Sequence, residues 1–269
     1  MENNLEPKYK IDKVDLINGR WYFKKSKEKD LTFYFPSVTT ILNVIDKGEG
    51  FHRWLGNSLS YDHAMDYGNS AAQTGSIVHA YVMQLLWGEK VDTKEDFFDM
   101  YSLSPEPIKV GNSVNKRLMG FIEFIKEYKP DILANEMSLY NSKRSKKSFV
   151  YPWAGQVDQV YKIDGKNWMI DVKTGKEYKT HELQLTAYKL LWDSLYPEEP
   201  IEIMAALYLS DGWRKKPTYK VKKYSFNPEM WLNVLDLWNW NNNFPGPNFS
   251  KEFPTEFQII EEYYNKGEE

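Results

Sequence analysis

Apolar and polar residues alternate with a period of two along much of the second half of the chain, which predicts short strands. The segment NEMSLYNS alternates most clearly. Two further runs flank Asp164-Gly165, a dipeptide that is a strong signal for a two-residue hairpin turn. The predicted strands cover residues 135–142, 149–161, 167–172, 201–210 and 218–226.

Apolar residues spaced three and four apart predict helices in the remaining segments. The clearest is THELQLTAYKLLWDSL (180–195), whose apolar stripe consists of Leu183, Ala187, Leu190 and Leu191. Other helices are expected at residues 51–68 (the weakest pattern), 71–87 and 113–128, and a last one after Asn227-Pro228.

The first forty residues predict a hairpin followed by a short helix. Residues 8–35 contain Asn18-Gly19, a turn signal, between two apolar-rich arms. Ser37 then precedes VTTILNVI, where its side chain is suited to cap a helix.

From residue 135 onward the predicted order is three strands, a helix, two strands and a helix. A helix that joins two strands of one sheet is typical of an α/β fold with a mixed sheet. We expect a single domain over residues 1–269, because no break in composition separates its halves. Within it we expect a mostly helical elaboration at 1–130, a core at 131–240 and a C-terminal extension at 241–269.

Composition supports a packed core and restricts the chemistry. Hydrophobic residues make up 42% of the chain and aromatic residues 16%, so large buried surfaces are available. There is no cysteine, which excludes disulfides, thiolate metal sites and a cysteine nucleophile. The net charge is −3, which argues against a broad basic coat for nucleic acid but allows a local basic groove.

The sequence predicts no contact with a membrane. No apolar run approaches the roughly 18–20 residues of a membrane span, and the first residues lack the apolar stretch of a signal peptide. We therefore expect an intracellular protein, in the cytoplasm of the host cell if the source is a phage or a bacterium, with an organelle left open.

Two basic clusters are candidates for binding a phosphate backbone. One comprises Lys143, Arg144, Lys146 and Lys147, and the other comprises Arg214, Lys215 and Lys216. A solvated loop is the commoner explanation of such a cluster, and both explanations stay open here.

The chemistry centres on the hairpin around Asp164-Gly165. If its ladder keeps one register, Asp158 on the first strand lies opposite Asp171 on the second, with both carboxylates on one face. Opposed carboxylates repel unless a cation lies between them, and Mg²⁺ prefers such oxygen ligands. Lys173 lies on the same face as Asp171 and can orient or deprotonate a metal-bound water. The alternative is that Lys173 is simply the ion-pair partner of both acids.

These residues resemble the RecB-like branch of the PD-(D/E)XK nuclease superfamily. That branch has a G-x-x-D strand, a D/E-x-K strand and then a Q-x-x-x-Y helix, which match GQVD, DVK and QLTAY here. An upstream G-x-x-x-H helix matches Gly75 and His79, so the four motifs span residues 75–188 in the expected order. The segment FPSVTTIL is also similar to N-terminal segments of phage-type and mitochondrial exonucleases of the branch.

The resemblance implies a restriction-endonuclease-like core and assigns roles to individual residues. It implies Mg²⁺, with Mn²⁺ as a substitute, bound by His79, Asp158, Asp171 and the carbonyl of Val172. It implies that Asp158, Asp171 and Lys173 are catalytic and that Glu136 assists the metal. Substrate contacts are expected from Gln184, Tyr188, Lys143 and Arg144. His52, His63 and His181 receive no role.

Two features of the branch are missing. Several relatives hold an iron–sulphur cluster through cysteines, which this chain does not have. No G-x-x-x-x-G-K-[ST] motif is found, so ATP-driven unwinding is not expected of this chain alone.

We therefore expect a metal-dependent DNA exonuclease that hydrolyses phosphodiester bonds at single-stranded ends in replication, repair or recombination. DNA is the expected partner, together with replication or recombination proteins. Two alternatives remain: a structure-specific endonuclease, and a non-catalytic nucleic-acid-binding protein that retains the nuclease fold.

Overall fold

The computed structural model of the chain describes most of the predicted core. The described residues are 5, 7, 10–25, 32–93, 107–141, 152–242 and 246–248. The predicted C-terminal extension therefore lies almost wholly outside them.

The described residues form eight strands and six helices. The strands are β1 (Asp12–Leu16), β2 (Gly19–Lys25), β3 (Thr32–Pro36), β4 (Asp131–Tyr140), β5 (Ala154–Ile163), β6 (Lys166–Lys173), β7 (Ile203–Leu209) and β8 (Tyr219–Tyr224). The helices are α1 (Val38–Leu42), α2 (Glu49–Gly56), α3 (Tyr61–Leu86), α5 (Pro107–Tyr128), α6 (Thr180–Leu195) and α7 (Pro228–Asn241).

The central element is a five-stranded mixed sheet in the order β4-β5-β6-β7-β8. Strands β6 and β7 are parallel, and the other neighbours are antiparallel. Helix α6 makes the crossover that a parallel pair requires. The predicted α/β fold with a mixed sheet is thus confirmed.

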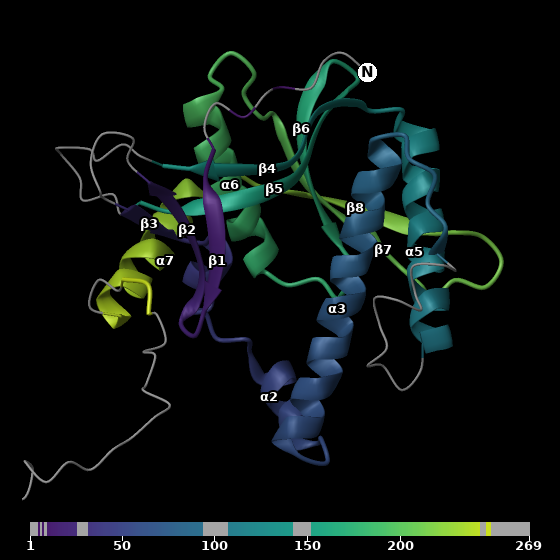
Figure 1. Cartoon of the computed structure of the whole chain (residues 1–269), viewed down its shortest axis with the longest axis horizontal. Coiled ribbons are helices and arrows are strands. Elements are labelled where there is room, and N and C mark those ends of the chain that lie inside the picture. The colour runs from purple at the N-terminus through teal and green to yellow at the C-terminus, as the bar shows by residue number, and fades with distance from the viewer. Residues whose placement is uncertain are drawn as a thin grey trace, which may run out of the picture.

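A smaller antiparallel sheet, in the order β1-β2-β3, lies beside the central one (Figure 1). The predicted Asn18-Gly19 turn joins β1 to β2, and Leu16 pairs with Gly19. Gly19 has a φ of +113°, a backbone conformation that glycine adopts without a steric penalty.

Helices cover both faces of the central sheet. Side chains of α3 and α5 pack on one face around Phe121, Phe124 and Ile170. Side chains of α1, α6 and α7 pack on the other face around Trp192, Trp231 and Met169. Figure 1 shows α3 and α5 running side by side, with α2 projecting beyond the sheet at the far end of α3. None of the described helices is both long enough and apolar enough to cross a membrane.

Capping residues set the ends of several helices. Ser37 accepts a hydrogen bond from the Thr40 N–H at the start of α1, and Asn227 does the same for Met230 at the start of α7, as predicted. Helix α6 has the predicted bounds.

The predicted division into helices at 51–68 and 71–87 is wrong. The first helix, α2, ends at Gly56, and α3 begins at Tyr61 and continues to Leu86. Ser60 caps α3 by accepting a hydrogen bond from the His63 N–H. The polar first half of α3 hid this start, because most of its residues with a described burial are exposed, Ala64 excepted, and they form no apolar stripe.

Gly155 allows α6 to lie close to β5. A Cβ atom at this position would lie 2.3 Å from Cε1 of Tyr188 and 3.3 Å from Cγ2 of Val38. The ring of Tyr188 therefore packs directly on the strand backbone, which fixes the position of α6 against the sheet.

Replacing Gly155 with alanine is expected to lower the free energy of unfolding by about 1–3 kcal/mol, because the added methyl overpacks this contact. Chemical denaturation measures the change. Gly56→Ala is the matched control, since nothing lies within 4 Å of a Cβ atom there. Equal stability of the two variants would contradict the close packing of Tyr188 on Gly155.

Candidate metal centre

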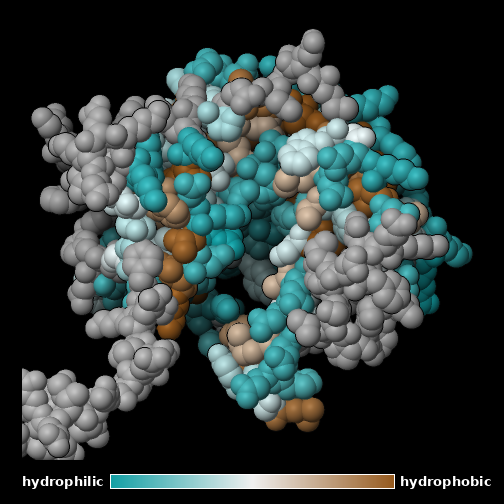
Figure 2. All heavy atoms as spheres, in the orientation of Figure 1, coloured by the Kyte–Doolittle hydropathy of each residue, from teal (hydrophilic) through white to brown (hydrophobic). Residues whose placement is uncertain are grey.

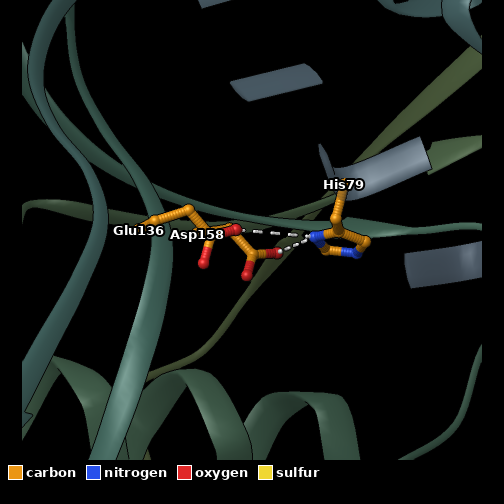
Figure 3. A group of neighbouring side chains, drawn as sticks. All are labelled: His79, Glu136 and Asp158. Atoms are coloured by element: carbon orange, nitrogen blue, oxygen red, sulfur yellow. Dashed lines mark ion pairs between the residues drawn. The ribbon is translucent and has the colours of Figure 1, made fainter. Parts of the chain in front are cut away.

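Three potential metal ligands converge where α3 crosses β4 and β5. Ligand atoms of His79, Glu136 and Asp158 all lie within 4.8 Å of one another. His79 Nδ1 is 3.5 Å from Asp158 Oδ2 and 4.0 Å from Glu136 Oε1. Figure 3 shows both carboxylates directed at the same ring nitrogen. The three side chains are only 13–29% exposed, so they form a partly buried cluster.

A glycine one turn before the histidine brings α3 to this position. A Cβ atom on Gly75 would lie 3.1 Å from Oγ1 of Thr174, so a side chain at this position would crowd the end of β6. The G-x-x-x-H pattern thus has a steric reason: the small residue lets the helix approach, and the histidine one turn later reaches the acids.

Sheet register brings the two acids together. Asn135 pairs with Gln159 and Met137 pairs with Val157, which places Glu136 opposite Asp158. Directly opposed residues of an antiparallel pair share a face. Glu136 has a φ of +49°, a left-handed conformation that costs a non-glycine residue on the order of 1 kcal/mol. Such strain is often found at functional sites.

The β5–β6 ladder has the predicted register, but it ends one pair before the two aspartates. The last pair of the ladder joins Gln159 to Ile170, so Asp158 and Asp171 face each other just beyond it. Here the Val172 N–H donates a 2.8 Å hydrogen bond to Asp158 Oδ2. The N–H and C=O of one strand residue lie along the same edge, so the Val172 carbonyl also faces β5.

Asp171 belongs to a second polar group, which α6 completes. Lys173 Nζ lies 2.5 Å from Asp171 Oδ2 and donates a 3.0 Å hydrogen bond to Gln184 Oε1. Gln184 Nε2 donates to Asp171 Oδ1 at 3.3 Å and to the Tyr188 hydroxyl at 3.1 Å. The D-x-K strand and the Q-x-x-x-Y helix thus form one hydrogen-bonded unit beside the cluster of His79, Glu136 and Asp158.

Burial and mutual repulsion change the ionisation of the acids. Burial, followed by the charge of Asp158, raises the pKa of Glu136 to about 7. Burial also raises the pKa of Asp158 to about 6, and the charge of Asp171 adds to this while His79 opposes it. Burial lowers the pKa of Lys173, but the charges of Asp171 and Asp158 outweigh it, so the net shift is upward and the ammonium form dominates.

The donor set fits a divalent cation. Two partly buried carboxylates with raised pKa values are stabilised in the ionised form by a nearby positive ion. Carboxylate oxygens suit Mg²⁺, and the imidazole nitrogen also suits Mn²⁺. His79, Glu136 and Asp158 are the residues that the structure brings within mutual reach of one ion.

Gln156 is a site residue that the sequence did not single out. Its Nε2 donates hydrogen bonds to both the carboxylate and the backbone carbonyl of Glu136. Its Oε1 accepts a 3.1 Å bond from Lys13 of β1. Gln156 lies inside the G-x-x-D motif, but its position carries no sequence signal, because the contact depends on the pairing of β4 with β5.

Of the four predicted substrate residues, the structure describes two. Gln184 and Tyr188 lie beside Lys173, and both are buried, at 9% and 5% exposure. Lys143 and Arg144 lie outside the described residues. The second basic cluster, Arg214, Lys215 and Lys216, is exposed in the β7–β8 loop.

Comparisons with known proteins show a partial likeness of shape. Neither the scan against protein-family models nor the search of curated proteins gives a match. Among solved structures, a "Putative exonuclease" from Eubacterium rectale aligns with 74% of this chain and 80% of its own, at 13% identity and a TM-score of 0.42. The protein SSO0001 aligns with 58% of this chain and 69% of its own, at 15% identity and a TM-score of 0.31.

The raised pKa values predict how metal and pH affect stability. The ordinary values are 4.5 for Glu136 and 3.8 for Asp158, so the folded state binds these protons more tightly than the unfolded state. The stability of the metal-free protein is therefore expected to fall by a few kcal/mol as the pH rises from about 4 to about 7. Thermal unfolding in EDTA across this pH range measures the loss.

Saturating Mg²⁺ or Mn²⁺ is expected to raise the melting temperature by about 5 °C or more at pH 8, and far less at pH 5, where protons compete. His79→Ala is expected to remove the shift. His63→Ala, at an exposed position of the same helix, is the matched control. A full shift in the His79 variant would rule out this histidine as a ligand.

Proposed function

We propose that this chain is a metal-dependent deoxyribonuclease that hydrolyses phosphodiester bonds. One observation carries the proposal: the cluster of His79, Glu136 and Asp158 lies one strand away from an ion-paired Asp171 and Lys173. Charged groups arranged around a phosphoryl centre are what this hydrolysis requires.

The residues have distinct proposed roles. Asp158 and His79 hold Mg²⁺, with Asp171 and the Val172 carbonyl as further ligands and Glu136 as an auxiliary acid. When bound, the ion supplies an activated water and offsets the negative charge of the phosphate. Asp171 accepts hydrogen bonds from Lys173 and Gln184, and as a ligand it would keep them, because each carboxylate oxygen has a second lone pair.

Lys173 acts as a cationic hydrogen-bond donor. Its raised pKa keeps the ammonium charged at neutral pH, so it does not serve as the base that removes a proton from water. Its charge instead orients the attacking water and stabilises the charge that develops on the phosphate oxygens.

We propose that Gln184 and Tyr188 position neighbouring side chains, in place of the predicted contacts with the DNA substrate. Gln184 bonds both Lys173 and Asp171, and the buried Tyr188 hydroxyl accepts a bond from Gln184. These hydrogen bonds fix the Lys173 amine relative to the Asp171 carboxylate, which an exposed side chain in contact with DNA would not do.

The shape of the molecule favours an exonuclease over the alternatives. Figure 2 shows a hollow between the side formed by β1–β3 and α7 and the side formed by α3 and α5, with α2 below it. A hollow with helices around it suits a single strand that enters by its end. A structure-specific endonuclease is the second candidate, and a non-catalytic DNA-binding protein is disfavoured because Asp158, Asp171 and Lys173 are all present.

DNA is the proposed partner, with replication or recombination proteins as further partners. The basic residues Lys143 and Arg144, and the loop residues 214–216, are proposed to guide its phosphates. Binding through such loops weakens as salt rises.

Lys173→Ala is expected to lower cleavage of single-stranded DNA in Mg²⁺ by at least about 100-fold, because the donor next to the scissile phosphate is lost. Gel analysis of end-labelled DNA measures the rate, with EDTA as the metal-free arm. Lys176→Ala removes an exposed charge three residues away and is expected to retain activity. Cleavage by the Lys173 variant at the rate of the control would refute its role.

Linear and circular single-stranded DNA of one sequence distinguish the two enzyme candidates. We expect linear DNA to be degraded and circular DNA to persist, since a circle offers no end. Cleavage of both at similar rates would favour the endonuclease. If neither is cut in Mg²⁺ or Mn²⁺, the enzyme proposal fails and the binding protein remains.

A further inference from the structure

A row of polar side chains continues from the catalytic strand across β7 and β8. In the sheet register Lys173 lies beside Tyr208, and Tyr208 lies beside Lys220. Two residues away along each strand, Asp171, Ala206 and Lys222 form a second row on the same face. Laterally paired residues project from the same face, so Lys220 and Lys222 of β8 share the face of Lys173.

A contact with His181 of α6 shows that this is the face of the sheet that α6 covers. His181 Nδ1 lies 2.7 Å from the Tyr208 hydroxyl, and that hydroxyl lies 2.7 Å from the Tyr224 hydroxyl. Lys222 Nζ lies 4.8 Å from the centre of the Tyr224 ring. Aromatic rings and lysines thus alternate on the surface that adjoins Lys173.

A cavity of about 380 Å³ opens at the edge of this surface. It lies between the β6–α6 loop, the end of β7 and the start of β8. Aromatic rings, hydroxyls and charged groups line it, among them Tyr208, Tyr219, Lys220, Thr174, Ser210 and Arg117. Its size is within the usual range of small-molecule pockets, and its lining combines rings with hydrogen-bonding groups.

Glu177, from the β6–α6 loop, bridges the two lysines. Its Oε2 lies 3.1 Å from Lys220 Nζ, and its Oε1 forms an ion pair with Lys222. The side chains of Lys220, Lys222 and Glu177 are 66%, 35% and 38% exposed. Ion pairs at such exposure contribute little stability, so a phosphate group can replace the carboxylate at small cost.

We propose that Lys220, Lys222 and the cavity beside Tyr208 form a subsite for single-stranded DNA, which Glu177 occupies in the free protein. The two ammonium groups bind a backbone phosphate, and the cavity takes the attached nucleoside against the ring of Tyr208. Stacking on aromatic rings combined with contacts to phosphate is the usual mode of binding single strands.

The distance across the sheet determines which nucleotide binds here. Neighbouring strands lie about 4.8 Å apart, so the backbone of β8 is roughly 10 Å from that of β6. Lys220 and Lys222 therefore bind the DNA beside the scissile phosphate and not the scissile phosphate itself. This subsite rests on the proposed nuclease function and extends it by naming the path that the strand follows.

The test is binding of a short fluorescent oligothymidine, measured by anisotropy in EDTA so that no cleavage occurs. Changing Lys220 and Lys222 together to alanine is expected to weaken binding about tenfold. The slope of log K against log salt is expected to become shallower by about 0.7, because one phosphate contact of a single strand is lost.

Lys223→Ala is the matched control. Lys223 follows Lys222 in β8, so its side chain projects from the opposite face of the sheet. Its Nζ lies 4.4 Å from the centre of the Trp168 ring. It removes one positive charge from the same strand without touching the subsite. If single Lys222→Ala and Lys223→Ala variants bind equally well and the double variant binds like wild type, the subsite is refuted.

Glu177→Gln gives a test in the opposite direction. Removal of the competing charge is expected to tighten binding about threefold, since both lysines become available to phosphate. Unchanged or weaker binding would refute the competition by Glu177. Melting temperatures of all variants show whether a change in binding reflects a change in folding.

Failure of this subsite and failure of the proposed function give different results. If wild type does not cleave DNA in Mg²⁺ but binds it through Lys220 and Lys222, the subsite holds and the nuclease proposal fails. If wild type cleaves DNA and the lysine variants bind it normally, the nuclease proposal holds and the subsite fails.

Discussion

The rest of the site depends on the repulsion between two carboxylates that the sheet holds side by side. Pairing of β4 with β5 places Glu136 opposite Asp158, and the helix that carries His79 closes the space above them. Burial is the largest cause of the raised pKa values of both acids, and the charge of Asp158 adds to it for Glu136 and that of Asp171 for Asp158. Ionising two such acids close together costs free energy, and a divalent ion between them would lower that cost. The arrangement is therefore unfavourable for stability alone and favours binding of a cation.

The neighbouring groups hold the Lys173 amine beside these acids. Gln184 reaches from α6 to both Asp171 and Lys173, and Tyr188 on the next turn packs against Gly155 of β5. The helix is therefore fixed by packing at one residue and by hydrogen bonds at another, four positions apart on a single face. Side chains held in this way keep a functional geometry more precisely than side chains on a loop.

Much of this arrangement was predictable because it depends on local patterns. The turn at Asp164-Gly165 fixed the hairpin register, and the apolar stripe gave the bounds of α6. Two kinds of feature were not predictable. The start of α3 depends on a single cap in a polar stretch, at Ser60. The contacts of Gln156 and Tyr208 arise from pairing between strands distant in sequence, and such pairing leaves no mark on composition or spacing.

The parallel pairing of β6 with β7 also bears on how the protein folds. Antiparallel neighbours such as β5 and β6 can form from a short turn, whereas β7 joins β6 only after α6 has crossed the sheet. The cluster at His79 needs a still more distant segment, α3, to dock on the opposite layer. Contacts between segments so far apart in sequence require the closure of long loops, which slows folding. A cation bound by these three side chains would stabilise only the folded state, since the unfolded chain does not bring them together.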